Sequence, residues 1–387
     1  MDEVAPIVIV GAGPAGLTAA YFLSKAGKKV CVVDQKSRAG RKFLVAGHNG
    51  LNLTNNLDLD AFLAKYPDEI IRKAVRQFSP QDFRDWFSDL GIATYVGTSG
   101  KVFPIPSLKP IEVLNRWMQI LETQDVSFYF NSKCIQVTEQ DIILEDKNTV
   151  QHLPYSHLIF ATGGKSWKMT GSDGMWTRLF PSLNILPFQP SNAGFVLNHN
   201  QNYQKLEGLP LKNVVFYMGE MQLKGEVVFT SKGLEGAPIY ALNQLVRKGT
   251  RALYIDLKPT MTAESIIGHL EKAKNPTTAL KELKLGKAAL LLLKSLPKET
   301  FVHATLLAQH MKRFPLEVSG LYPIDRAIST VGGISLLDLN EHFQHHALNR
   351  TFFIGEMVDW DAPTGGYLLQ ACFSMGFVAA QAILKTN

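Results

Sequence analysis

The stretch Ile7-Val8-Ile9-Val10-Gly11-Ala12-Gly13-Pro14-Ala15-Gly16 decides the fold of this 387-residue chain. Its β-branched first half predicts a buried strand, and its second half is a GxGxxG glycine turn. A helical pattern over residues 17–25 follows, and a second apolar run over residues 30–33 ends in Asp34. A strand, a glycine turn, a helix, a second strand and an acid in this order predict a dinucleotide-binding Rossmann unit.

The three glycines of the turn have different tasks. Gly11 allows the tight turn, Gly13 lets a pyrophosphate approach the backbone, and Gly16 lets the helix pack closely on the strand. The helix N-terminus then faces the phosphates with free N–H groups. Asp34, 23 positions after Gly11, can accept hydrogen bonds from the adenosine ribose. The alternative is a glycine turn without a ligand, and the motif alone does not separate FAD from NAD.

Later segments of the chain indicate FAD. Residues 158–164 and 351–356 are apolar strand patterns that end in glycine, and residues 363–366 open an apolar terminal helix that runs to about Ile383. Glu356 can bind ribityl hydroxyls, and the N-terminus of the terminal helix can face N1 and C2=O of the isoalloxazine ring. A plain NAD dehydrogenase, which would purify colourless, has no use for this second anchor.

Several motifs together resemble one family of flavoproteins. The chain is similar over its whole length to the two-dinucleotide-binding-domain flavoproteins, and among them to the HI0933-like (BaiN-like) family of FAD-dependent oxidoreductases. Two departures concern the flavin and substrate region, because Leu51-Asn52 replaces the family's Arg-Cys-Asn and Leu368 replaces its usual Asn. Asp34 also stands where Glu is commoner. The motifs that carry the resemblance are residues 11–16, 40–42, 46–55, 161–164, 225–230, 233–238, 331–333, 355–359 and 364–367.

The motifs and the resemblance together define an expected FAD site. Arg41 and Lys42 are expected to contact the pyrophosphate or the flavin carbonyls, or else to be solvated. Whether FAD is bound covalently is left open, and no metal site is expected. The expected FAD-binding residues are Gly11, Gly13, Pro14, Ala15, Gly16, Asp34, Gly40, Arg41, Lys42, Gly47, Asn52, Thr162, Gly163, Gly355, Glu356, Gly365, Gly366, Tyr367 and Leu368.

Four residues are candidates for catalysis, because flavin performs the redox step and the protein need only position, shield and protonate. His48 could donate a proton or a hydrogen bond to the ring, although a His in a glycine loop is more often structural. Lys101 could approach the ring or form the tip of a surface hairpin. Trp360 could form a wall of the flavin site or stack on substrate, and Tyr367 could donate a proton or serve helix packing.

The expected fold class is α/β, with a Rossmann-like FAD-binding domain that carries an inserted small β domain and a helical cap. Residues 1–186 and 330–387 form the FAD-binding domain. Short strand patterns separated by glycines predict a small antiparallel sheet or barrel over residues 187–260 and 315–329. Residues 261–314 read as helices, with lysines marking one face and leucines another. This cap is expected to lie over the flavin, as the resemblance implies.

The composition is that of an ordinary globular protein, with 46% hydrophobic and 19% charged residues. Three cysteines without CxxC spacing argue against a disulfide framework, a zinc site or a dithiol redox pair. Apolar runs look too short for a membrane span, and the acidic start does not resemble a secretory signal. We therefore expect a cytoplasmic protein with no membrane partner and an open oligomeric state.

The net charge of +6 is uneven, because residues 258–313 hold ten Lys and Arg against four Glu. This surplus indicates either a solvated helical face or a surface that attracts anions. The leading hypothesis is a FAD-dependent oxidoreductase that acts on an unidentified small molecule, with the reduction of an activated C=C bond as one candidate reaction. NAD(P)H is possible as external reductant, and nucleic acid is expected to be an unlikely partner. The alternative is a flavin-dependent RNA-binding or RNA-modifying protein that uses the basic cap.

Overall fold

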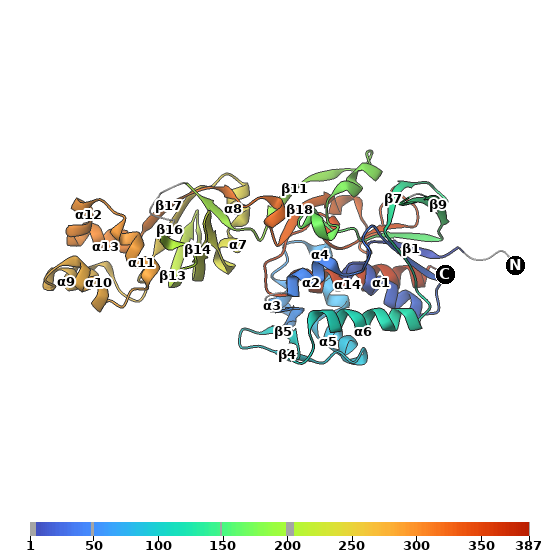
Figure 1. Cartoon of the computed structure of the whole chain (residues 1–387), viewed down its shortest axis with the longest axis horizontal. Helices are drawn as coiled ribbons and strands as arrows, with labels where there is room; N and C mark the ends of the chain where they lie inside the picture. The colour runs from blue at the N-terminus through green and yellow to red at the C-terminus, as the bar shows by residue number, and fades with distance from the viewer. Residues whose placement is uncertain (1–4, 48–49, 148, 199–204, 387) are drawn as a thin grey trace. The chain divides into compact units, whose positions relative to one another are not determined.

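The computed structural model describes residues 5–47, 50–147, 149–198 and 205–386. The chain divides into two compact units (Figure 1). Unit 1 comprises residues 1–189 and 329–387, and unit 2 is the contiguous segment 190–328. The chain therefore leaves unit 1 once and returns to it once.

Unit 1 is built on a parallel sheet in which the first strand, β1, lies at the centre. Both β10 and β2 pair with β1, and β19 completes the sheet beside β10. Residues far apart in the sequence are thereby neighbours, since Ile354 N donates to Phe160 O at 2.9 Å. The strand order is β19 (Thr351–Phe353), β10 (His157–Phe160), β1 (Ile7–Val10), β2 (Val30–Asp34) and β6 (Ser127–Phe130).

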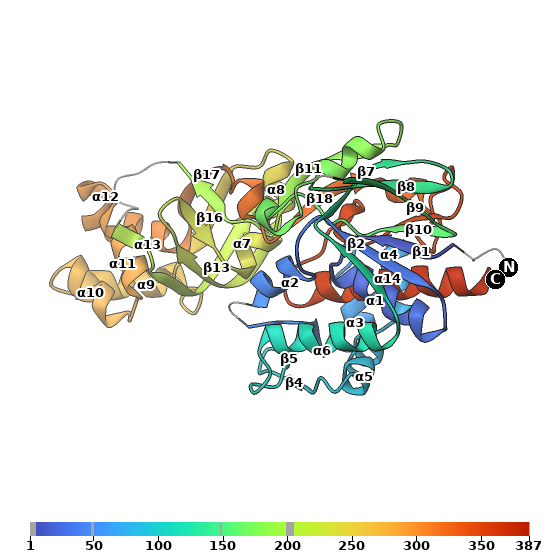
Figure 2. The same ribbon diagram turned by 45° about the vertical axis from the view of Figure 1, so that its right-hand side comes forward.

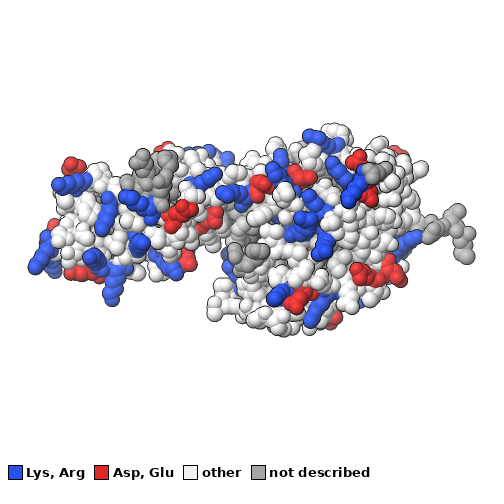
Figure 3. All heavy atoms as spheres, viewed as in Figure 1, with Lys and Arg blue, Asp and Glu red and all other residues white. Residues whose placement is uncertain are grey.

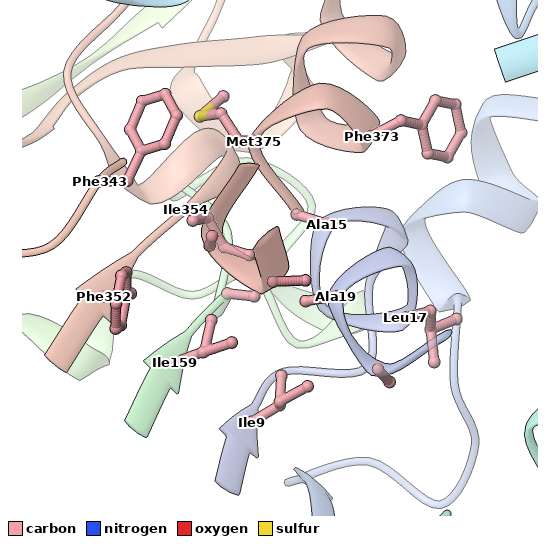
Figure 4. Close-up of a cluster of buried hydrophobic side chains, with 14 of the residues drawn as sticks. Ile9, Ala15, Leu17, Ala19, Ile159, Phe343, Phe352, Ile354, Phe373 and Met375 are labelled. Carbon is pink, nitrogen blue, oxygen red and sulfur yellow. The ribbon is translucent and has the colours of Figure 1, made fainter. Parts of the chain in front are cut away.

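Helices from the two ends of the chain pack together against this sheet. Helix α1 (Pro14–Lys25) follows β1, and α14 (Tyr367–Lys385) is the last helix. A Cβ on Gly376 would lie 2.4 Å from Ala15 O, so this glycine permits close packing of the two helices. Figure 4 shows apolar side chains of β1, β10 and β19 meeting those of both helices. The predicted Rossmann-like domain is confirmed.

Helix α14 is long and apolar enough to cross a membrane by length and composition, which the sequence analysis had not expected. Within the chain, however, 67% of its most apolar window is buried. Phe373 stacks on Phe83, and Gln370 and Ser374 both donate to Phe78 O. Packing inside unit 1 thus accounts for the apolar character of this helix.

The remaining elements of unit 1 flank the Rossmann sheet (Figure 2). Ser79 is the N-cap of α5, and its hydroxyl and the carboxylate of Asp82 form a capping box. Two small antiparallel sheets have the orders β3-β5-β4 and β7-β8-β9. These elements are α2 (Arg41–Ala46), β3 (Thr54–Asn55), α3 (Leu59–Leu63), α4 (Glu69–Gln77), α5 (Pro80–Asp89), β4 (Thr94–Val96), β5 (Lys101–Pro104), α6 (Pro110–Thr123), β7 (Ser132–Val137), β8 (Asp141–Asp146) and β9 (Thr149–Pro154).

Unit 2 contains a closed six-stranded barrel, which confirms the predicted barrel-like insertion. Its strands are longer than the sequence patterns indicated, since β13 and β14 each have nine residues. The separate pair β11 (Ile185–Ser191) and β18 (Ser329–Ile334) forms where the chain passes between the units. The barrel order is β12 (Phe195–Leu197), β15 (Gly233–Glu235), β14 (Met221–Phe229), β13 (Pro210–Met218), β16 (Ala252–Asp256) and β17 (Phe314–Leu321).

The helices that follow β16 share one apolar core with the barrel. Three basic residues of this region are used internally. Lys312 pairs with Asp256 at 2.6 Å, Lys258 donates to Leu283 O, and the guanidinium of Arg313 lies 4.0 Å from the ring centre of Tyr254. The helices of unit 2 are α7 (Ala237–Ala241), α8 (Asn243–Arg247), α9 (Ala263–Lys272), α10 (Pro276–Glu282), α11 (Lys287–Lys294), α12 (Lys298–Val302) and α13 (Ala304–Lys312).

Candidate flavin site

The glycine turn has the geometry of a dinucleotide-binding turn. Gly11 has φ +115°, and a Cβ there would lie 2.3 Å from Ala161 O. A Cβ on Gly16 would lie 2.0 Å from Gly11 O, so both glycines are required by packing inside the protein. Gly13 differs, because a Cβ there would meet no atom of the described residues within 4 Å. Packing within the described protein therefore does not explain why this position is a glycine, and the open space beside it fits the approach of a ligand.

The start of α1 offers free backbone donors beside this open position. Gly13 is its N-cap and Pro14 begins the helix. Among the residues that the structure describes, no side chain caps this end, and the first turn holds no acid. An uncapped helix N-terminus carries a partial positive charge and attracts phosphate. This end of α1 can hold the pyrophosphate of a dinucleotide.

Asp34 is fixed at the end of β2 by two backbone donors. Its carboxylate accepts hydrogen bonds from Ala12 N at 2.9 Å and from Lys36 N at 2.8 Å. Burial raises the pKa of Asp34 above its ordinary value, and the two backbone hydrogen bonds oppose that rise. The carboxylate is therefore held beside the glycine turn, where an adenosine ribose is expected.

We expect Asp34→Asn to weaken FAD binding about tenfold, because the carboxamide has one acceptor oxygen and sets an NH2 group against a backbone donor. FAD affinity should also fall as the pH is lowered through the pKa of Asp34. Because this pKa is raised, the carboxylate becomes protonated at a higher pH than an ordinary aspartate does. Equilibrium dialysis of FAD at several pH values measures both effects. Asp58→Asn, at the N-cap of α3, is the matched control. Equal FAD affinity in the two variants would refute this role.

Glu356 lies at the centre of a polar cluster that joins four segments of unit 1. Lys42 Nζ contacts Glu356 Oε2 at 2.6 Å and Ser166 Oγ at 2.7 Å. Thr330 N donates to Glu356 Oε1 at 2.9 Å, and a Cβ on Gly164 would lie 1.9 Å from Thr330 Oγ1. The cluster therefore holds Glu356 at the carboxyl end of the sheet.

Two residues expected near the pyrophosphate or the flavin carbonyls have different surroundings. Lys42 contacts Glu356 and Ser166, whereas Arg41 is exposed, and their contact with a cofactor stays a prediction. Ser166 and Thr330 were not predicted. The glycine pair at 163–164 was the available signal, because it marks a close approach to the strand end.

The N-terminus of α14 meets the segment that follows α2. A Cβ on Gly366 would lie 2.5 Å from the carbonyl of Thr54, and Asn55 Nδ2 donates to Gly365 O at 3.5 Å. No side chain of the described residues caps α14, and its first turn holds no acid. The buried atoms Asn52 Oδ1 and Thr54 Oγ1 have no hydrogen-bond partner in the described part of the chain. This end of α14 thus offers uncapped N–H groups next to unused hydrogen-bonding capacity.

The segment that carries Glu356 lies beside the first turn of α1. A Cβ on Gly355 would lie 3.1 Å from Ala15 Cβ in the first turn of α1. Gly376, where α14 crosses α1, is about 14 Å along the helix axis from Tyr367, at 1.5 Å per residue. A ligand that reaches both helix N-termini must therefore be extended, as FAD is.

The candidate catalytic residues have different environments. His48 lies outside the described residues. Lys101 is exposed on β5, at the hairpin with β4. Trp360 is buried and donates from Nε1 to Gly355 O at 2.9 Å, which gives it a packing role. Tyr367 packs on Phe62, and burial raises the pKa of its phenol, which therefore stays protonated. Of the described candidates, Tyr367 is the one kept in a donor state at the α14 N-terminus.

The other expected cofactor residues lie around the same strand ends. Gly40 N donates to Ala12 O, and a Cβ on Gly47 would lie 2.6 Å from Pro110. Thr162 Oγ1 contacts Met357 Sδ at 3.5 Å, while Gly163 O accepts from the indole of Trp176. Leu368 is half-buried against the core. Their placement is compatible with a cofactor site, and their individual roles stay predictions.

Comparison with known proteins identifies the family. The profile of the HI0933-like protein Rossmann domain matches residues 5–382. The chain belongs to the HI0933-like family. Two relatives, each 23% identical to this chain, are called ribosomal RNA dihydrouridine synthase. They come from Escherichia coli (strain K12) and from Haemophilus influenzae (strain Rd). The first comparison covers 98% of each chain, and the second covers 100% of each.

Solved flavoprotein structures share the fold of this HI0933-like protein. A flavocytochrome c3 fumarate reductase has a TM-score of 0.56 at 13% identity, over 99% of this chain and 78% of that one. The 3-ketosteroid delta1-dehydrogenase of Sterolibacterium denitrificans has a TM-score of 0.57 at 10% identity, over 99% of this chain and 100% of that one. Family and fold thus confirm the expected FAD-dependent oxidoreductase.

The described residues fit FAD at three points. The open position at Gly13 and the uncapped start of α1 suit a pyrophosphate. The fixed carboxylate of Asp34 suits a ribose, and the uncapped start of α14 suits the electron-rich edge of a reduced isoalloxazine ring. No group of three or more His, Cys, Asp or Glu suited to a metal ion is found among the described residues.

Proposed function

We propose that this HI0933-like protein reduces uridine to dihydrouridine in ribosomal RNA, with FAD as redox cofactor. The observation that carries the proposal is the pair of full-length relatives called ribosomal RNA dihydrouridine synthase. The proposal combines two hypotheses from the sequence. The reduction of an activated C=C bond comes from the leading hypothesis, and the RNA partner comes from the alternative. It reverses the expectation that nucleic acid is an unlikely partner.

The chemistry suits a flavin site. The C5=C6 bond of uracil is conjugated with C4=O, and its reduction adds two electrons and two protons. Reduced FAD, when bound, would supply the hydride, and an external donor such as NAD(P)H would restore the reduced flavin. The residues of this chain would hold the flavin and donate the remaining proton. Tyr367, with its phenol kept protonated by burial, is the candidate donor.

The basic surface of unit 2 supports an RNA substrate. Figure 3 shows Lys and Arg side chains over its helices α9 to α13 on the face in view. Polyanion binding by such a surface is strongly salt-dependent because counterions are released. A cytoplasmic location would follow from this substrate. The exposed lysines of these helices and of the connections between them are Lys272, Lys274, Lys281, Lys284, Lys287, Lys294 and Lys298.

The proposal is tested by incubating the FAD-loaded protein anaerobically with unmodified, transcribed ribosomal RNA. NADH and NADPH are supplied in separate reactions. In a third reaction the flavin is reduced by light, so that this reaction does not depend on a nicotinamide donor. Digestion to nucleosides and mass spectrometry then measure dihydrouridine. We expect dihydrouridine in the photoreduced arm and in at least one donor arm. No dihydrouridine above that of heat-inactivated protein, with the flavin shown to be reduced, would refute the proposed function.

A further inference from the structure

We propose that Trp167 is a stacking platform for a base of the RNA strand that enters the flavin site. This inference rests on the proposed function. Trp167 belongs to the loop of residues 165–174, which follows the glycine pair at the end of β10. The loop therefore begins at the strand end where the flavin is expected.

The loop exposes apolar side chains. Trp167 is 40% exposed and Met169 is 73% exposed, and Met175 just beyond the loop is 37% exposed. Apolar side chains gathered on a surface loop indicate an interaction site. The contrast within the chain is sharp, because the four other tryptophans are at most 6% exposed. These buried tryptophans are Trp86, Trp117, Trp176 and Trp360.

The loop is attached on both sides to residues of the flavin site. Ser166 Oγ accepts from Lys42 Nζ, which also binds Glu356. On the other side, Gln35 Nε2 donates to Gly171 O at 2.7 Å, next to Asp34. The platform is thus tied to the elements that hold both ends of the expected dinucleotide.

The tip of the loop is itself ordered by hydrogen bonds. Thr170 donates to Trp167 O from its amide at 2.8 Å and from its hydroxyl at 2.7 Å. Trp167 has φ +60° and ψ +51°, a left-handed conformation that is uncommon for a non-glycine residue. Strained backbone tends to persist where a side chain must be presented in one direction. A preorganised aromatic side chain loses little conformational entropy on binding.

The charge around the loop selects RNA as the occupant. Lys165 and Lys168 are exposed within the loop, and Arg178 is exposed shortly after it. Bases stack on aromatic side chains with little sequence preference, while basic side chains follow the phosphates. Ribosomal RNA is also the substrate of the proposed function, and access to a uridine within it requires an unstacked strand. The competing occupant, a second copy of this chain, is an outcome of the test.

The test compares the FAD-loaded wild-type protein with Trp167→Ala and Trp167→Phe. The probe is a single-stranded 12-mer of uridine, and binding is measured by fluorescence anisotropy of a labelled strand. We expect Trp167→Ala to lower affinity about tenfold, within the range for loss of one base–aromatic stack, and Trp167→Phe to stay within about threefold of wild type. Leu337→Ala, which truncates an 87% exposed apolar side chain elsewhere in unit 1, should bind like wild type.

Tryptophan fluorescence gives a second readout that a structural effect would not reproduce. The RNA should quench the exposed emission of the wild-type protein, and Trp167→Phe should abolish that quenching, because the other tryptophans are buried. FAD content and melting temperature should match wild type in all variants. These two measurements exclude unfolding as the cause of weaker binding.

Three outcomes would overturn the inference. Unchanged affinity in Trp167→Ala, with quenching retained in Trp167→Phe, would refute the platform and leave the proposed function standing if wild type makes dihydrouridine. A wild-type protein that neither binds RNA nor makes dihydrouridine would refute both. A wild-type dimer in sedimentation that Trp167→Ala converts to monomer, at unchanged RNA affinity, would assign the loop to self-association.

Discussion

Gly13→Glu is expected to purify as a folded protein without FAD. A Cβ at position 13 meets nothing within 4 Å, so the apoprotein accommodates the first atom of the new side chain. The added carboxylate, however, stands at the uncapped start of α1, where it occupies the place of the pyrophosphate and repels it. We expect the FAD content, measured by flavin absorbance, to fall from about one equivalent per protein chain to below a tenth of an equivalent.

The matched control is Gly268→Glu, at another helical position where a Cβ meets nothing within 4 Å. This variant should keep its flavin, and its helix should be slightly more stable because glycine is a poor helix former. Absorbance near 450 nm against protein concentration, with circular dichroism to establish folding, measures the effect. Full FAD occupancy in a folded Gly13→Glu variant would rule out the glycine turn as the pyrophosphate site.

Glu356→Leu is expected to weaken FAD binding by about 1–3 kcal/mol, roughly 5- to 150-fold in Kd. The substitution removes the carboxylate that holds Lys42, and it leaves the amide of Thr330 without its acceptor. The two side chains of the ion pair are 15% exposed for Glu356 and 25% exposed for Lys42, so water replaces the lost partner poorly. The melting temperature should also fall.

A double-mutant cycle with Lys42→Met separates the ion pair from direct contact with the ligand. Glu356→Gln is the conservative control, since it keeps an acceptor for Thr330 and should lose less affinity than Glu356→Leu. Titration of the apoproteins with FAD measures each Kd. Strict additivity of Glu356→Leu and Lys42→Met would contradict a role for the pair. An unchanged Kd in Glu356→Leu would exclude Glu356 from the site.

The elements that the sequence predicted best are those whose local chemistry is sufficient to form them. The strand, turn and helix over residues 7–25 appear as β1 and α1, and Asp34 closes β2. The capping box at Ser79 is equally local, because it needs only a serine, a proline and an acid at fixed spacing. Local steric and hydrogen-bonding rules act over a few residues, so a pattern is enough to locate such elements.

The parts that the sequence did not predict depend on contacts between distant segments. Lys42 and Glu356 are 314 positions apart, and no local pattern pairs them. Thr330 joins them only because β18 returns to unit 1 after the insertion. The lysines that the pattern of residues 261–314 assigned to one face are likewise spread over α10, α11, α12 and the connection after α10. Such side-chain pairs are set by tertiary packing, which periodicity does not encode.

The return of the chain to unit 1 after residue 328 imposes an order on biosynthesis. Unit 2 is contiguous and can fold as soon as it has left the ribosome, because domains form as units during translation. The Rossmann sheet, in contrast, lacks β19 until residue 353 is made, and α1 lacks its partner α14 until the last residues emerge. Flavin loading is therefore expected only after α14 has emerged, and nascent chains that have exposed residue 328 but not residue 351 should carry a finished barrel and no flavin.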